Sequence, residues 1–279
     1  MQIAPRVPRP RVERYHRRDS SITEPRDASF QRHPPDHHAR SRVPPRAGAT
    51  SGSRVKLTIV PVTPYQQNCS LVVCTRTLRA ALVDPGGEVD RLLAAVTQSG
   101  ATLEKVLVTH GHVDHCGGAA EVAERTGVPI EGPQREDAFW IDRLDEQGAS
   151  FGVPGARSFT PDRWLDGGDV ATVGEIAFDV LHCPGHTPGH VVFASRAHRI
   201  ALVGDVLFAG SIGRTDFPRG DHDTLIRSIT TRLWPLGDDM RFVPGHGPMS
   251  TFGDERRDNP FVGDDALARP RRGAMAAGG

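Results

Sequence analysis

The sequence predicts an α/β protein of four layers, an αββα sandwich in which two β-sheets pack face to face between outer helices. Short runs of branched apolar residues alternate with helical patterns in both halves of the chain. Each such element must bury its apolar face against another element, which favours a layered arrangement. Hydrophobic residues make up 37% and charged residues 24% of the 279 residues, the composition of a globular domain with a substantial core.

Strands and helices alternate from residue 55 onwards. Runs of branched residues predict strands, helical spacing that stops at a glycine predicts helices, and Asp84-Pro85-Gly86-Gly87 predicts a turn. In the first half the expected strands are Val55–Val62, Cys69–Thr75, Ala80–Val83 and Val106–Thr109, and the expected helices are Val89–Ser99 and Gly117–Thr126. After a variable stretch, 134–164, the expected elements are the strands Val170–Val173, Ile176–His182, Val191–Ala194, Arg199–Val203 and Phe242–Val243 and the helix Asp221–Leu233.

The two ends of the chain differ from the expected domain between them, residues 55–263. Residues 1–54 hold twelve Arg, no Lys and five acidic residues with almost no periodic apolar residues, so apolar burial cannot offset their ordering entropy. We expect either a disordered leader or a segment upstream of a true start near Val55. Both interpretations rank above a basic nucleic-acid arm or a transit peptide. Residues 264–279 are rich in Ala, Gly and Arg and are expected to form a flexible tail.

Composition argues against several classes of protein. Aromatic residues make up only 6% of the chain, and acidic residues outnumber basic ones after residue 54, so a nucleic-acid partner is not expected. No apolar run in the sequence is long enough to cross a bilayer, so no membrane partner is expected.

The four cysteines, Cys69, Cys74, Cys116 and Cys183, form no CxxC pair and indicate a reducing compartment. We expect a cytoplasmic monomer, with Cys116 as a small buried residue rather than a ligand.

The main chemical signal is the loop Thr109-His110-Gly111-His112-Val113-Asp114-His115, which lies between an expected buried strand and a helix. Three imidazoles and a carboxylate are costly to place at the end of a core strand without a cation. His nitrogen and carboxylate oxygen are ligands that zinc and iron prefer. We expect His110 and His112 to share one ion, and Asp114 and His115 to turn toward a second.

Three further candidate ligands, His186, Asp205 and His246, lie at the ends of expected strands, each beside a glycine that lets the backbone approach closely. A single His is usually a satisfied polar residue, but seven metal-type residues in these positions predict a two-metal site. For His190, in the same loop as His186, we favour a hydrogen-bonding role at the start of a strand over a supporting role behind the ligands.

This pattern resembles the metallo-β-lactamase superfamily, and within it the short bacterial glyoxalase II-like (hydroxyacylglutathione hydrolase-like) branch, from about residue 55 to 261. All seven positions of the family signature are filled in this sequence. The resemblance implies a metallo-β-lactamase sandwich and two metals that share one carboxylate. It implies that the first metal is held by His110, His112 and His186, the second by Asp114, His115 and His246, and that Asp205 is the bridge.

The resemblance and the expected site together predict a metal-dependent thioester hydrolase. Two divalent ions, with Zn favoured over Fe or Mn, would share a bridging hydroxide at neutral pH. Asp114 is the expected catalytic residue, because it can bind the second metal and orient that hydroxide. The substrate would be a small acyl thiol such as S-D-lactoylglutathione. Because the metal charge stabilises the oxyanion, no serine or cysteine nucleophile is needed.

Other branches of the superfamily fit the sequence less well. The commonest class of true β-lactamases carries Cys where this chain has Asp205. RNA-processing members carry extra domains or an arm not found here. Glyoxalase II itself has a long helical C-terminal extension that helps hold glutathione, whereas few residues follow His246.

The run Gly213-Arg214-Thr215-Asp216-Phe217 leaves two activities open. It resembles a loop of short glyoxalase II-like hydrolases, but also one of persulfide dioxygenases, which hold a single iron by two His and one Asp. The matching trio here is His110, His186 and Asp205. We rank the thioester hydrolase ahead of the dioxygenase, and a non-catalytic metal-binding protein third.

Arg214 has two possible roles in this loop. Its planar guanidinium can bind a substrate carboxylate, or it can pair with an acid such as Asp216 to hold the loop. The sequence favours neither.

Overall fold

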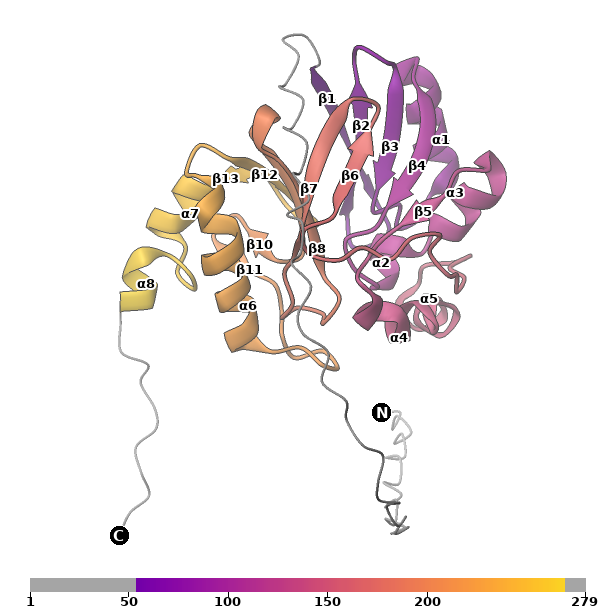
Figure 1. Cartoon of the computed structure of the whole chain (residues 1–279). Helices are drawn as coiled ribbons and strands as arrows, with labels where there is room; N and C mark the ends of the chain where they lie inside the picture. The colour runs from indigo at the N-terminus through magenta and orange to yellow at the C-terminus, as the bar shows by residue number, and fades with distance from the viewer. Residues whose placement is uncertain (1–53, 269–279) are drawn as a thin grey trace, which may run out of the picture. The chain divides into compact units, whose positions relative to one another are not determined.

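Two β-sheets lie face to face at the centre of the molecule, and helices cover the outer face of each sheet (Figure 1). The structure is a computed structural model that describes residues 54–268, which belong to a single compact unit, 47–279. The expected leader, 1–54, lies outside the described residues except for Arg54. The αββα sandwich predicted from the sequence is confirmed.

The first sheet has five strands in the order β1-β2-β3-β4-β5. Their bounds are β1 Val55–Val62, β2 Gln67–Cys74, β3 Arg79–Val83, β4 Thr102–Leu107 and β5 Ile130–Glu131. The first three strands pair antiparallel, while β4 and β5 are added in parallel. Parallel neighbours end at the same edge of a sheet, so the loop that follows β4 opens at the edge where β3 also ends.

The second sheet has six strands in the order β13-β12-β9-β8-β7-β6. Their bounds are β6 Val170–Val173, β7 Ile176–His182, β8 Val191–Ser195, β9 Ile200–Gly204, β12 Arg241–Pro244 and β13 Ser250–Thr251. Only β9 and β12 pair in parallel. A separate two-stranded ribbon is formed by β10 Leu207–Phe208 and β11 Ser211–Ile212.

Three apolar cores separate the four layers. The middle core joins the facing sides of the two sheets, where Val83 and Leu107 of the first sheet meet Phe193 and Leu202 of the second. The two outer cores lie between each sheet and its helices. This burial is the main source of stability, and it fixes the strand ends that carry the site.

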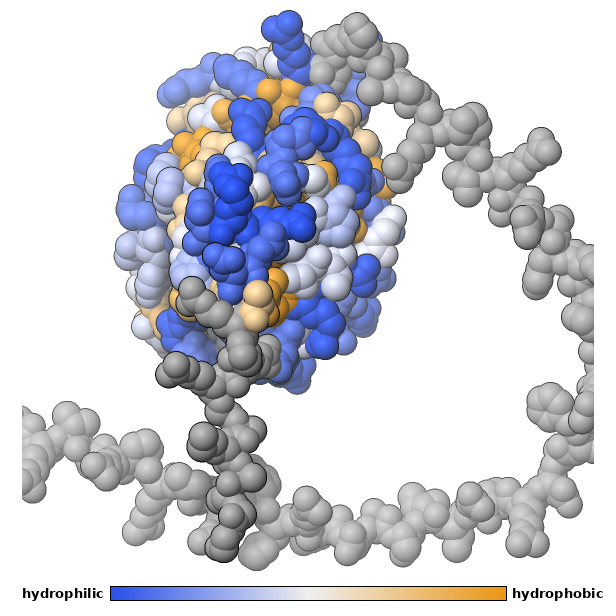
Figure 2. Space-filling view, turned by 90° about the vertical axis from the view of Figure 1, so that its left-hand side faces the viewer, coloured by the Kyte–Doolittle hydropathy of each residue, from blue (hydrophilic) through white to orange (hydrophobic). Residues whose placement is uncertain are grey.

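The helices that cover the sheets each bury one face against a sheet. The first sheet is covered by α1 Val89–Ser99 and α3 Ala119–Thr126, and the second by α6 His222–Ser228, its π-helical continuation η3 Ile229–Leu233, and α7 Phe252–Asp258 (Figure 1). The outer surface on the side of α6 and α7 is mostly hydrophilic, with small scattered apolar patches (Figure 2). Within residues 54–268, no helix is long and apolar enough to cross a membrane.

The strongly periodic elements follow the prediction, and the short ones differ from it. β4 begins four residues earlier and ends two earlier than expected, because its first four residues are exposed or half-buried and carry no continuous apolar run. The variable stretch contains helices α4 Ala138–Ile141 and α5 Leu144–Phe151. The expected tail begins with a short helix, α8 Asp264–Ala268, and its remainder, 269–279, lies outside the described residues.

Candidate metal centre

All seven predicted ligands come together at one edge of the sandwich, although they come from four separate segments. The loop after β4 carries His110 and His112, and the short helix α2, Val113–Cys116, carries Asp114 and His115. The remaining three lie in loops of the second sheet: His186 between β7 and β8, Asp205 after β9 and His246 after β12. The parallel pairing of β9 with β12 places the last two loops side by side.

The first group of ligands consists of three histidines. The Nδ1 atom of His112 lies 3.2 Å from Nε2 of His110 and 3.0 Å from Nε2 of His186. All three side chains are buried, and their ligand atoms lie within 4.8 Å of one another. Burial lowers the pKa of His112 to about 3, so the rings are neutral and offer lone pairs, the form that binds a metal ion.

The second group consists of a carboxylate and two histidines. Oδ2 of Asp114 lies 3.2 Å from Nε2 of His246 and 3.8 Å from Nε2 of His115. Burial raises the pKa of the Asp114 carboxyl, but the charge of His115 and the hydrogen bond to His246 outweigh burial and bring the pKa below its ordinary value. Asp114 is therefore an anion at neutral pH, able to bind a cation.

Asp205 lies between the two groups. Its Oδ1 is 3.3 Å from Nε2 of His115, and its Oδ2 is 3.6 Å from Nε2 of His186 and 3.7 Å from Nε2 of His246. The carboxylate thus faces ligand atoms of both groups, the position that a bridging ligand needs.

Unpartnered atoms show that the cluster fits divalent cations. Within residues 54–268, Nε2 of His115 and Oδ1 of Asp205 are buried without a hydrogen-bond partner, and both face the ligand groups. Burial lowers the pKa of His115, but Asp205 and Asp114 outweigh burial and raise it well above the ordinary value. The two carboxylates therefore favour positive charge at this position, and a divalent ion there would supply it and pair with the orphaned atoms of His115 and Asp205.

Acceptors behind the rings fix which nitrogen of each ligand faces the centre. The Nδ1 atom of His186 donates to the carbonyl of Arg214 at 2.7 Å, and Nδ1 of His246 donates to the carbonyl of Tyr65 at 3.1 Å. A proton held on Nδ1 leaves the Nε2 lone pair free for a metal, which is the usual role of residues behind a metal site.

Asp84 is a supporting residue that the sequence analysis interpreted only as part of a turn. It is buried, its Oδ2 accepts from Nδ1 of His115 at 2.9 Å, and its two oxygens accept the N–H and hydroxyl of Thr109 at 2.7 and 2.6 Å. Asp84 also groups with His110 and His115 as a possible metal cluster, but these three donors already occupy its oxygens. An acidic residue directly after a buried strand was the available signal.

Asp137 is a second supporting residue that sequence analysis missed. Its fully buried carboxylate accepts from the backbone N–H of Gly111 at 2.9 Å, the hydroxyl of Thr187 at 2.8 Å and the N–H of Gly189 at 2.6 Å. These residues flank the three ligands of the first group, so one carboxylate joins the two loops that carry them. No local pattern marks Asp137, because its partners lie 26 to 52 residues away.

His190 supports the ligands and does not only start a strand. Its Nε2 accepts from the backbone N–H of Asp205 at 3.1 Å, and its ring stacks on His110 with centroids 4.6 Å apart. Gly204 has a φ of 50°, and a Cβ there would lie 2.7 Å from the His190 ring. Glycine is therefore required beside Asp205.

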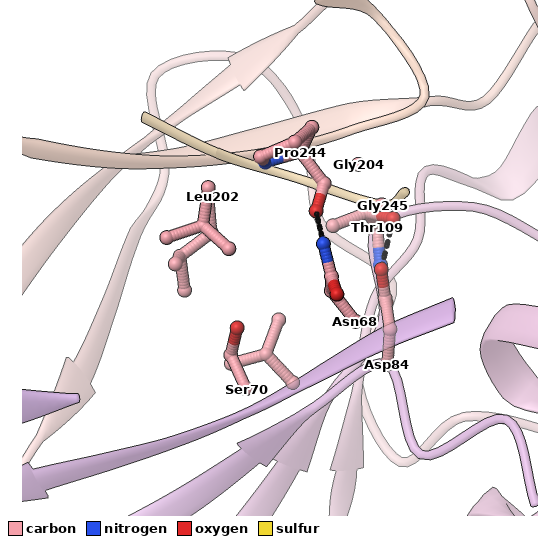
Figure 3. Close-up of a pocket in the computed structure, with 10 residues that line it drawn as sticks. Asn68, Ser70, Asp84, Thr109, Leu202, Gly204, Pro244 and Gly245 are labelled. Atoms are coloured by element: carbon pink, nitrogen blue, oxygen red, sulfur yellow. Dashed lines mark hydrogen bonds between the residues drawn. The ribbon is translucent and has the colours of Figure 1, made fainter. Parts of the chain in front are cut away.

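The loop that carries His246 is fastened to the first sheet. The side chain of Asn68 donates to the carbonyls of Pro244 at 3.1 Å and Gly247 at 2.9 Å, and its N–H donates to Gly245 at 2.7 Å. Figure 3 shows the Asn68–Pro244 bond beside a cavity of about 10 Å³ between the sheets, which Ser70 also lines. These bonds hold the loop of His246, which follows a strand of the second sheet, against β2 of the first sheet.

An open pocket of about 550 Å³ lies over the ligands. Its walls include His112, Asp114, Asp205 and Arg214. The guanidinium of Arg214 donates to both oxygens of Asp216 at 2.9 and 2.8 Å, and it lies 4.6 Å from the ring centroid of Phe217. The structure thus places Arg214 at the pocket and also pairs it with Asp216.

Comparison with known proteins identifies the family. Residues 62–246 match the metallo-beta-lactamase superfamily. The chain belongs to this superfamily. It is 46% identical to hydroxyacylglutathione hydrolase GloC of Haemophilus influenzae over 209 residues, which cover 75% of this chain and 98% of the relative. The predicted resemblance to short bacterial hydrolases is therefore confirmed, and the chain is a metal-binding hydrolase of this fold.

Solved structures of the superfamily match over nearly their whole length. The BLEG-1 B3 metallo-beta-lactamase has a TM-score of 0.69 at 32% identity and covers 74% of this chain and 99% of its own. TTHA1623 in a di-iron-bound form has a TM-score of 0.67 at 36% identity, and the match covers 73% of this chain and 99% of that structure. ETHE1 from Myxococcus xanthus has a TM-score of 0.63 at 26% identity, and the match covers 77% of this chain and 92% of that structure.

Proposed function

We propose that the protein hydrolyses a thioester such as S-D-lactoylglutathione with two divalent ions. The observation that carries this proposal is the position of Asp205, whose oxygens face ligand atoms of both groups beneath an open pocket. The similarity to hydroxyacylglutathione hydrolase GloC supports the choice of a thioester.

The ligands divide into two sets on either side of Asp205. We assign His110, His112 and His186 to the first ion, Asp114, His115 and His246 to the second, and Asp205 to both. Divalent ions held by these residues would supply a bound water of lowered pKa and a positive charge to polarise the acyl oxygen of a substrate.

Asp114 is the proposed catalytic residue. It lines the pocket, its side chain is 18% exposed, and it is anionic at neutral pH. One of its oxygens contacts His246, which leaves the other able to accept a hydrogen bond from a water in the pocket and orient it toward the acyl carbon. A thiolate is a good leaving group, so no further acid is needed.

The ligand set accepts Zn, Fe or Mn, and we favour Zn, although the similar protein TTHA1623 was crystallised in a di-iron-bound form. We also propose that the protein acts as a cytoplasmic monomer on a small-molecule acyl thiol, with no nucleic acid or membrane as partner.

A single-iron persulfide dioxygenase is the second candidate. His110, His186 and Asp205 would hold the iron, and the loop 213–217 and the likeness to ETHE1 support this alternative. The additional ligands Asp114, His115 and His246 weigh against it, because a single ion would leave them facing an empty position.

Thiol release from S-D-lactoylglutathione, measured together with metal content, tests the proposal. We expect two ions per chain and hydrolysis that is lost in Asp114→Ala but kept in Asp258→Ala, a matched exposed aspartate on α7. One iron per chain with oxygen uptake on glutathione persulfide would instead establish the dioxygenase. Bound metal without turnover of any acyl thiol would establish a non-catalytic protein.

A further inference from the structure

The pocket over the ligands is walled by aromatic side chains. The chain has eleven Phe, three Trp and two Tyr, and five of these line this pocket: Tyr65, Trp140, Phe151, Phe208 and Phe217. A chain with so few aromatic residues thus concentrates them where a substrate binds. The pocket volume of about 550 Å³ exceeds what a small hydroxyacyl group can fill, and aromatic walls are usual in small-molecule sites of this size.

The aromatic wall begins at a metal ligand. The rings of Trp140 and Phe217 both meet the ring of His112 edge to face, with centroids 4.6 and 4.7 Å away. Tyr65 and Phe151 form the exposed part of the wall, at 45% and 48% exposure, and the hydroxyl of Tyr65 donates to the carbonyl of Phe151 at 3.0 Å. A substrate group held beside His112 therefore contacts Trp140 and Phe217.

The pocket offers little to a substrate carboxylate. Among the described residues that line it, Arg214 is the only Lys or Arg, and both oxygens of Asp216 already accept from its guanidinium. The next cation of this loop, Arg219, lies over the ring of Phe139 at 4.1 Å, and neither residue lines the pocket. Recognition must then come mainly from apolar contact.

We propose that this pocket selects thioesters whose acyl group is aromatic or branched aliphatic, with a polar thiol carrier that remains in solvent. The proposal rests on the thioester hydrolase function proposed above. Apolar acyl groups gain by leaving water, whereas the hydroxyl of a lactoyl group loses its water partners against these rings. One methylene in an apolar pocket changes specificity by about 10–200-fold.

Two thioesters of the same thiol test the proposal on the metal-loaded full chain. We expect kcat/KM for S-phenylacetylglutathione to exceed that for S-D-lactoylglutathione at least about tenfold. Phe151→Ala should lower this ratio, whereas Phe261→Ala should leave it unchanged, because Phe261 is equally exposed at 50% but lies outside the pocket. A wild-type ratio of one or less, or an equal loss of the ratio in both variants, overturns the proposal.

Binding of the product acids separates this inference from the proposed function. Calorimetry on the metal-loaded protein should show phenylacetate bound at least about tenfold more tightly than D-lactate. If phenylacetate binds more tightly and no thioester is hydrolysed, the proposed function is wrong and only the preference of the pocket for binding an aromatic acyl group stands. If lactoylglutathione is hydrolysed and phenylacetate binds no more tightly, the selectivity is wrong and the hydrolase stands.

Discussion

The carboxylate of Asp84 and the ring of His115 are joined by a hydrogen bond of 2.9 Å in a fully enclosed position. The same carboxylate accepts the N–H and hydroxyl of Thr109, the residue directly before His110. The Asp84 side chain therefore orients His115, a ligand of the second group, and also the strand end from which His110 of the first group projects. Groups behind a metal ligand can be nearly as important for affinity as the ligand itself.

Asp84→Asn should weaken metal binding, because an amide has one acceptor oxygen for three donors. We expect a loss of about 10–100-fold in metal affinity, measured by titration against a competing chelator. Asp162→Asn is the control, since Asp162 accepts the N–H of Ile130 at 2.8 Å away from the ligands. Unchanged affinity in Asp84→Asn would show that this bond has no effect on the site.

Asp137→Asn should affect the first metal more than the second. All three partners of Asp137 are donors, so an amide places N–H against N–H beside the His110, His112 and His186 group. We expect a stability loss of about 1–3 kcal/mol and earlier release of one of the two ions during chelation.

Glu255→Gln is the matched control for Asp137. Glu255 is also a buried carboxylate that accepts from three donors, Gly210, Ser250 and Asn259, but none of them flanks a ligand. This variant should lose stability and keep both ions. Equal metal loss in the two variants would contradict a positioning role for Asp137.

Gly245→Ala should abolish the second metal site. A Cβ at Gly245 would lie 2.1 Å from Oδ1 of Asp205 and 2.5 Å from the ring of His115, so two ligands must move. Gly247→Ala in the same loop meets no atom within 4 Å but has a φ of 76°, and it should cost only about 1–2 kcal/mol. Metal content and thermal unfolding distinguish the two effects, and full metal content in Gly245→Ala would refute the expectation.

Removal of metal should destabilise the fold, because buried atoms of His115 and Asp205 are left unpartnered. At free metal about 100-fold above its Kd, binding adds about 2.7 kcal/mol, so a chelator should lower Tm by about 5–10 °C. Metal added back should restore Tm fully in the wild type, and the rise in Tm should be smaller in Asp205→Asn. No change of Tm with chelator would mean that the cluster holds no ion.

The role of Arg214 can be separated by comparing Arg214→Met with Asp216→Asn. If the pair holds the loop, as its two hydrogen bonds suggest, both variants should raise KM for S-D-lactoylglutathione alike, with kcat little changed. If Arg214 binds a substrate carboxylate, Asp216→Asn should lower KM by freeing the guanidinium. We expect the first result.

Local sequence determined the fold class and the candidate ligands. Strand and helix periodicity is a property of neighbouring residues, and it predicted β1, β6, β7 and α1 at their observed bounds. The run His110 to His115 concentrates ligand-type side chains that a buried strand end tolerates only beside a cation. His186, Asp205 and His246 were recognisable because each lies beside a glycine at the end of a strand.

Only the tertiary structure decided which distant groups support those ligands and what lines the pocket. Asp84 and Asp137 accept hydrogen bonds from residues 25 to 52 positions away. The paired Arg214, the stacked His190 and the aromatic wall also depend on which loops meet at the edge of the two sheets. Such contacts leave no local pattern, because they are fixed by burial of the three apolar cores and not by the conformational preference of any one segment.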